Sequence, residues 1–242
     1  MKIQAKLLLA VIIAASTQAQ AASISTQASI TDVYVYASTG TATFQFTGND
    51  DYFYAGASVY DSNSDLLDSD YYDGPGPGSA DISGAGYLAS ANASATPSVY
   101  LESDFSQLGD ITSYVSGYMG YQMSGTGTVV LAITGYTAVT AAWMGEDNLY
   151  SSTYLQARVG NLVSYTNDYF DSYQGDGPFG GVYTLALFLD VDGFREGALD
   201  IYAQAYAFRY DADVVSTPIP AAAWLFGSAL LGLGAIKRRK AT

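Results

Sequence analysis

A two-residue alternation in one segment constrains the fold of this chain more than any other feature. In ALDIYAQAYAFRY (198–210), Leu199 and Ile201 begin a series of aliphatic residues that continues with alanines at 203, 205 and 207. The positions between them hold tyrosine, glutamine or phenylalanine from Tyr202 onwards. Successive side chains of a β-strand point to opposite faces. The segment therefore predicts a long strand with one aliphatic face and one aromatic face.

Similar alternation recurs along the chain between segments rich in Gly, Pro and Asp. We expect further strands at 30–38, 41–48, 54–61, 128–139, 152–163 and 182–191, loops at 61–79, 144–148 and 172–181, and a short helical turn within 103–117. Lysine and glutamate are scarce, so long helices are disfavoured, whereas tyrosine and threonine favour strands. The pattern predicts an all-β fold, an antiparallel β-sandwich, with a jelly-roll-like arrangement as one form of it.

The charge pattern and the missing residue types exclude several classes of function. Between Ala22 and Thr217 lie three arginines and all 23 acidic residues, which gives this part of the chain a charge of −20. Such a surface repels nucleic acid and anionic membranes, because phosphate binding needs a basic surface. The chain has no cysteine and no histidine. Disulfides, thiolate nucleophiles, Ser–His pairs and most imidazole metal sites are therefore excluded.

The first 21 residues have the three parts of a secretory signal peptide. Lys2 and Lys6 give a positive start, and residues 7–15 form a short apolar run. Ala19 and Ala21 supply the small residues that a signal peptidase recognises, so we expect cleavage after Ala21. The alternative is a buried N-terminal helix. The pattern predicts export by the general secretion machinery.

Residues 216–242 form a tail unlike the acidic body that precedes it. Two prolines are followed by an uncharged apolar stretch, 221–236, and then by a cluster of cations. As a helix this stretch would span about 25 Å, a little less than the ~30 Å hydrocarbon core of a bilayer. The residues of the tail that carry the pattern are Pro218, Ile219, Pro220, Lys237, Arg238, Arg239 and Lys240. We expect a transmembrane helix with the cations on the cytoplasmic side.

The order of proline motif, apolar helix and terminal cations resembles the PEP-CTERM sorting signal of exported bacterial proteins. Ile219 replaces the acidic residue of that motif, as in a subtype that begins Val-Pro-x-Pro-Ala. The resemblance implies processing by a membrane-embedded exosortase, transient anchoring, and a final place at the cell surface or outside the cell, in association with extracellular polysaccharide or biofilm. The alternative is a permanent single-pass anchor. Three parts follow: a signal peptide at 1–21, a body at 22–215 and a sorting tail at 216–242.

Two acidic segments contain candidate calcium ligands. The segment DSNSD (61–65) places oxygen ligands at alternating positions, as a calcium loop does. An EF-hand is excluded, because Leu66 and Tyr72 stand where that loop needs glycine and glutamate. A second set lies in DVDG (190–193) and its following turn. The candidate ligands are Asp61, Asn63, Asp65, Asp190, Asp192 and Glu196. The alternative is a pair of solvated acidic loops with Asx turns, and no other cofactor is expected.

The 22 tyrosines give the body its clearest functional feature. Tyrosine faces on strands, such as Tyr34 with Tyr36 and Tyr202 with Tyr206, would form platforms for sugar rings. The structural alternative is that tyrosine favours strands and closes the rim of a sandwich core. With 23 acidic residues some pair always has the spacing of a glycosidase, so the acid count identifies no catalytic pair.

We therefore expect a non-enzymatic, exported protein of the cell surface or extracellular matrix. The first alternative is a carbohydrate-binding module with tyrosine platforms, and the second is a secreted glycoside hydrolase. A third is self-assembly through β-prone segments such as TVVLAIT (128–134) and TLALFL (184–189).

Overall fold

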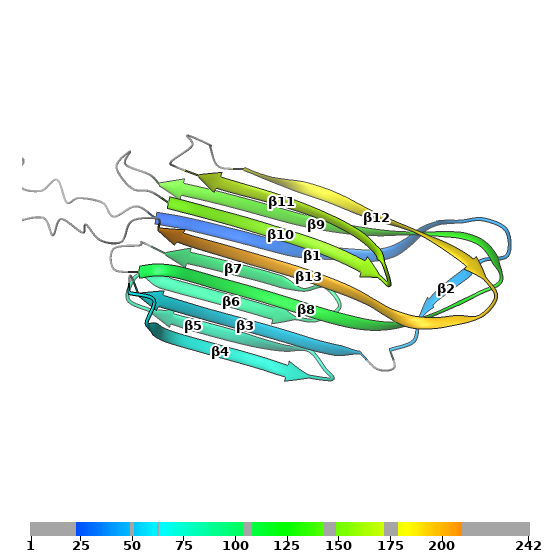
Figure 1. Ribbon diagram of the computed structural model, residues 1–242, viewed down its shortest axis with the longest axis horizontal. Coiled ribbons are helices and arrows are strands. Elements are labelled where there is room, and N and C mark those ends of the chain that lie inside the picture. The colour runs from blue at the N-terminus through cyan, green and yellow to red at the C-terminus, as the bar shows by residue number, and fades with distance from the viewer. Residues whose placement is uncertain are drawn as a thin grey trace, which may run out of the picture. The chain divides into compact units, whose positions relative to one another are not determined.

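The described part of the chain is an antiparallel β-sandwich, as the alternation predicts. The computed structural model describes residues 23–48, 51–61, 63–103, 108–142, 149–171 and 179–209. They belong to one compact unit, Ala21–Asp213. Two sheets pack face to face, and every pairing between described strands is antiparallel (Figure 1).

The predicted signal peptide (1–21) and the predicted sorting tail (216–242) lie outside the described residues. Within the residues that are described, no helix has the length and apolar character needed to cross a membrane.

The six-stranded sheet has the order β12–β9–β1–β7–β6–β5. Its strands are β1 (Ser23–Ser38), β5 (Gly78–Gly84), β6 (Tyr87–Ala93), β7 (Ser98–Ser103), β9 (Thr126–Ala142) and β12 (Gly180–Asp192). The seven-stranded sheet has the order β11–β10–β13–β8–β3–β4, and β2 pairs with β8. Its strands are β2 (Thr43–Phe46), β3 (Tyr52–Asp61), β4 (Leu66–Gly74), β8 (Leu108–Ser124), β10 (Leu149–Val159), β11 (Leu162–Asp171) and β13 (Arg195–Arg209).

The core lies between the two sheets, and the aliphatic face of β13 is at its centre. The alternation predicted for this strand is confirmed by its fully buried residues Leu199, Ile201, Ala203, Ala205 and Ala207. Burying one leucine or isoleucine side chain in this way stabilises the folded state by about 1.5–3 kcal/mol. The β-prone segments of β9 and β12 face the same core, through Leu131 and Ile133 in β9 and Leu187 in β12.

A single glycine carries the chain from one sheet to the other between β8 and β9. Gly125 separates the two strands and has a φ of 87°, a conformation that glycine adopts without strain. A Cβ at this position would overlap the carbonyl oxygen of Thr41. The amide of Gly193, between β12 and β13, donates to the carbonyl oxygen of Gly125 at 2.8 Å. Because β12 and β13 also lie in different sheets, this hydrogen bond links the two points at which the chain passes between the sheets.

Polar contacts join the edge of one sheet to the other sheet. Asp168 of β11 accepts a hydrogen bond from the hydroxyl of Tyr183 in β12 at 2.8 Å. It also accepts one from Thr137 of β9, a fully buried residue. Between the sheets, the hydroxyls of Thr26 and Ser151 lie 2.5 Å apart. These bonds hold β11 and β10 against the six-stranded sheet.

Three segments differ from their predicted structure. The strand expected at 152–163 is the hairpin β10–β11, because Gly160, with a φ of 57°, turns the chain. The loop expected at 61–79 contains β4 and the start of β5. Of the segment 103–117, where a helical turn was expected, residues 108–117 belong to β8, and residues 104–107 lie outside the described residues. In β4 most side chains on both faces are exposed, so its sequence lacks the alternation of a half-buried strand.

Candidate functional site

The outward side chains of the seven-stranded sheet form a continuous aromatic surface, here called the tyrosine face. Because β8, β10 and β13 bury their alternate residues in the core, the residues between them point outwards. Cross-strand pairing then brings the outward residues of neighbouring strands together. The tyrosines of this face are Tyr52, Tyr54, Tyr60, Tyr71, Tyr114, Tyr118, Tyr150, Tyr154, Tyr165, Tyr169, Tyr202 and Tyr206.

A groove with a volume of about 430 Å³ lies in the middle of the tyrosine face. It is lined by Tyr54, Tyr71, Tyr114, Ser116, Tyr118, Gln156, Arg158, Asp200 and Tyr202. These residues come from β3, β4, β8, β10 and β13, so the groove crosses most of the sheet. A site of this kind is built on strands rather than loops and is held by the sandwich itself.

The groove exists because Ser116 has a short side chain and is surrounded by four tyrosines. Tyr114 and Tyr118 lie two positions away on the same face of β8. Tyr54 of β3 and Tyr202 of β13 lie directly opposite Ser116 on the two neighbouring strands. A short side chain surrounded by four long ones leaves a hollow with a polar floor and aromatic walls.

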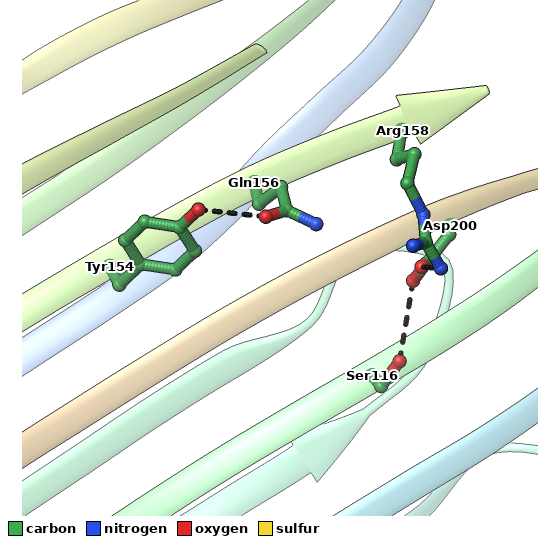
Figure 2. Close-up of polar contacts among 5 residues, drawn as sticks. All are labelled: Ser116, Tyr154, Gln156, Arg158 and Asp200. Carbon is green, nitrogen blue, oxygen red and sulfur yellow. Dashed lines mark hydrogen bonds and ion pairs between the residues drawn. The ribbon is translucent and has the colours of Figure 1, made fainter. Parts of the chain in front are cut away.

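An ion pair and a hydrogen bond fix the polar groups at the floor (Figure 2). Arg158 and Asp200 lie opposite each other on β10 and β13, and Nη2 of Arg158 donates to Oδ2 of Asp200 at 2.6 Å. Ser116 donates to Oδ1 of the same carboxylate at 3.4 Å. The side chain of Asp200 is 12% exposed and that of Arg158 is 46% exposed. The arginine thus keeps donors available to a ligand while it neutralises the carboxylate.

Gln156 is oriented by its neighbour on the same face of β10. The hydroxyl of Tyr154 donates to Oε1 of Gln156 at 2.7 Å (Figure 2). This bond occupies the oxygen of the amide, and the nitrogen has no acceptor among the described residues. Gln156 therefore presents N–H donors to a ligand in the groove.

Ring contacts brace the aromatic walls. The rings of Tyr54 and Tyr118 meet edge to face with centroids 6.0 Å apart. Tyr154 meets Tyr202 edge to face at 6.0 Å and stacks on Tyr165 at 5.8 Å. Such pairs add about 0.5–1.5 kcal/mol beyond the area that they bury. The rings of Tyr54, Tyr118 and Tyr202 are therefore held in place before a ligand arrives.

The hydroxyls of Tyr202 and Tyr52 stay protonated far above neutral pH. Burial raises the pKa of Tyr202 to about 12, with smaller contributions from Tyr114 and Tyr154. A hydrogen bond to Asp73 raises the pKa of Tyr52 to about 12. These groups are neutral hydrogen-bond donors and acceptors, not acids or nucleophiles, over the physiological range.

The sequence identified part of this site and missed the rest. Tyr202 and Tyr206 lie on the tyrosine face, and Tyr202 lines the groove. Tyr34 and Tyr36 lie on β1 of the other sheet, where they are 39% and 71% exposed. The other residues that line the groove were missed. Tyr71, Tyr114 and Ser116 lie in segments expected to be loop or helical turn, and Tyr118 comes just after the second of these. Tyr54, Gln156, Arg158 and Asp200 lie in expected strands but were not identified as site residues. The spacing Tyr-x-Ser-x-Tyr at 114–118 was the available signal for an outward strand face.

The calcium candidates occupy two separate places. Oδ1 of Asp61 accepts the backbone N–H groups of Asn63 and Asp65 at 2.8 and 2.9 Å. These bonds form the Asx turn that was the alternative reading, and they lower the pKa of Asp61.

The second set of candidates is divided between the two sheets. Asp190 and Asp192 share the exposed face of β12, and Glu196 is the second residue of β13. Asp190 accepts a hydrogen bond from Thr128 at 3.1 Å. Among the described residues, no three Asp or Glu side chains are grouped so that they could hold a metal ion. Calcium binding stays a prediction of the sequence.

The arrangement suits a flat, uncharged ligand that has one apolar face and several hydroxyl groups. Aromatic walls would stack on the apolar face, while Ser116, Gln156 and Arg158 would meet the hydroxyls. No family model, no curated protein and no solved structure matches this chain.

Proposed function

We propose that this protein is an exported, non-enzymatic surface or matrix protein whose β-sandwich binds polysaccharide in the groove of the tyrosine face. The observation that carries the proposal is the polar floor at Ser116 between the four tyrosines at positions 54, 114, 118 and 202. Sugar rings have an apolar face that stacks on aromatic rings and hydroxyl groups around their edges. The groove offers both kinds of partner.

The charge of the molecule favours a neutral polysaccharide. The segment between Ala22 and Thr217 has a charge of −20, so it repels polyanions over a long range. Arg158 is the cation that lines the groove within the described residues, and Asp200 neutralises it at 2.6 Å. The site therefore lacks the unpaired positive charge that a phosphate or uronate would need.

The carboxyl groups of the groove favour binding over hydrolysis. Glycoside hydrolysis ordinarily uses two carboxyl groups, about 5–5.5 Å apart in retaining enzymes and about 6.5–9.5 Å apart in inverting ones. Among the described residues that line the groove, Asp200 alone has a carboxyl group, and it is bonded to Arg158 and Ser116. This supports the non-enzymatic form of the proposal.

Export and sorting are the other half of the proposal, and the sequence at the two ends supports them. The signal peptide would be removed after Ala21, and an exosortase-type enzyme would process the tail 216–242. The sandwich would then reach the cell surface or the matrix, where polysaccharide is present. Intact mass of the protein recovered from its host tests this half, because a retained Lys/Arg cluster in a membrane fraction would identify a permanent anchor instead.

We also propose that the strands of the sandwich have a jelly-roll-like arrangement. In its support, the neighbouring pairs β8–β9 and β12–β13 both pass from one sheet to the other, and β8 pairs with β13 while β9 pairs with β12.

A glycan array probed with the full-length protein tests the binding function. We expect retention on neutral polysaccharides and at least a tenfold loss for Tyr202→Ala, roughly the effect of 1.4 kcal/mol. Tyr36→Ala is the matched control, because Tyr36 is 71% exposed on the other sheet. Retention on no glycan, or equal retention of the Tyr202→Ala and wild-type proteins, would overturn the proposal.

A further inference from the structure

One cross-strand row of the tyrosine face alternates tyrosine with a polar residue from strand to strand. In order across the sheet the row is Asp73 of β4, Tyr54 of β3, Ser116 of β8, Tyr202 of β13, Gln156 of β10 and Tyr165 of β11. Each member lies directly opposite the next. The three aromatic members, Tyr54, Tyr202 and Tyr165, are called the tyrosine row.

The spacing within the tyrosine row is set by the sheet. Neighbouring strands lie about 4.8 Å apart, so the Cα atoms of tyrosines on every second strand repeat at roughly 10 Å. This is close to the length of two sugar units in an extended chain of β-1,4-linked pyranoses. In such a chain each ring is turned over relative to the one before it. Every second ring therefore presents the same face to the sheet.

The polar members of the row lie where the intervening sugars would pass. Ser116 and Gln156 separate the three tyrosines. The amide of Gln156 has its oxygen bonded to Tyr154, which leaves N–H groups for the ring and hydroxyl oxygens of a sugar. Ser116 lies at the floor with Asp200 behind it. Alternate stacking and hydrogen-bonding positions thus follow each other across the strands.

Tyr165 shows that the row continues beyond the groove. It is 64% exposed on the edge strand β11 and does not line the groove. Its position is nevertheless supported, because Tyr154 stacks on it with an interplanar angle of 28°. A ring held in place on the surface adds little to the core, and it extends the line of Tyr54 and Tyr202.

We propose that the tyrosine row binds an extended, neutral, β-1,4-linked polysaccharide that runs across the strands, with every second sugar on Tyr54, Tyr202 or Tyr165. The inference rests on the proposed function and adds to it the linkage and the direction of the bound chain. The ligand is recognised as an internal stretch of a polymer, because the row is open at the edge where Tyr165 stands.

Titration calorimetry of the full-length protein with cello-oligosaccharides tests the inference. The tetraose can cover Tyr54 and Tyr202, whereas the hexaose also reaches Tyr165. We expect the hexaose to bind roughly tenfold more tightly than the tetraose, and Tyr165→Ala to remove this gain while leaving tetraose affinity unchanged. Tyr169→Ala is the control, since Tyr169 lies on the same face of β11 but outside the row and is 40% exposed.

Three outcomes would overturn the inference while the proposed function stands, provided that Tyr202-dependent binding to some glycan is seen. They are equal affinity for tetraose and hexaose, no effect of Tyr165→Ala on the hexaose, and equal binding of malto-hexaose, whose α-linked chain is curved. Failure to bind any glycan would instead remove the proposed function itself. Circular dichroism of each variant confirms folding, which the exposure of Tyr165 favours.

Discussion

The ion pair at the floor of the groove gives the sharpest test of how the site is held. Replacing Arg158 by methionine keeps much of its stem but leaves the carboxylate of Asp200 with Ser116 as its remaining partner. Replacing Asp200 by asparagine keeps the shape and removes the charge. Combining the two changes closes a double-mutant cycle, which isolates the interaction between the two side chains.

The exposed fractions of the two side chains set the expected loss of stability. Exposed pairs contribute about 0–1 kcal/mol, whereas removing one partner of a fully buried pair costs about 3–5 kcal/mol. The side chain of Asp200 is 12% exposed, but that of Arg158 is 46% exposed, so water screens the pair from one side. We expect Arg158→Met to lower the free energy of unfolding by about 2 kcal/mol. Asp200→Asn should lower it by only about 1 kcal/mol, because the arginine that is left behind can reach water.

Urea unfolding of the four proteins in the cycle, followed by circular dichroism, measures these costs from the midpoint at constant m-value. A cost below about 0.5 kcal/mol for Arg158→Met would refute the reasoning, since the pair would then behave as an ordinary surface contact. A larger cost for Asp200→Asn than for Arg158→Met would also refute it, because the exposed partner should be the easier one to leave unpaired.

Three further predictions concern the walls, the pH dependence and the sheet edge. In Gly56→Ala the new Cβ would lie 2.5 Å from Cζ of Tyr114. The ring of Tyr114 must tilt, so titration calorimetry should show weaker glycan binding. The free energy of unfolding measured in urea should change by less than about 1 kcal/mol. Burial holds the pKa of Tyr202 at about 12, above the value near 10 of an unfolded chain. The unfolded state therefore loses this proton first, and stability falls between about pH 10 and pH 12; Tyr202→Phe should make that fall shallower in urea midpoints measured against pH. Asp168→Ala removes two hydrogen bonds that join β11 to the other sheet and should cost about 2–4 kcal/mol in urea unfolding. A loss below about 0.5 kcal/mol would show that these bonds do not hold the edge.

The strands that sequence predicts best are the ones whose two faces differ most. β13 has an unbroken aliphatic face from Leu199 to Ala207, so its alternation identifies it without any knowledge of its partners. β8 is harder to recognise, because Ser113 and Gly117 occupy buried positions between its aliphatic residues. The hairpin β10–β11 is hidden because its short turn at Gly160 lies within a stretch, 152–163, that otherwise has the pattern of one strand.

The site depends on register, which no local pattern specifies. Tyr202 was predictable as an outward aromatic residue of its own strand. Its position opposite Ser116 on one side and Gln156 on the other follows from pairing between segments far apart in the sequence. The same pairing brings Tyr165 into line with Tyr202, which lies two strands away on the other side of β10. The outward position of Tyr202 was therefore predictable from its own strand, whereas the groove depends on strand pairing that only the three-dimensional structure shows.

Filling the floor of the groove tests the central claim most directly. Ser116→Leu leaves all four surrounding tyrosines in place and replaces the one small side chain on which the hollow depends. Titration calorimetry of this variant against the polysaccharide that the wild-type protein retains is the measurement to make, with urea unfolding as the check on the fold. The account predicts loss of binding with stability within about 1 kcal/mol of wild type, since position 116 faces outwards. Binding as tight as that of the wild-type protein would contradict it and place the ligand elsewhere on the molecule.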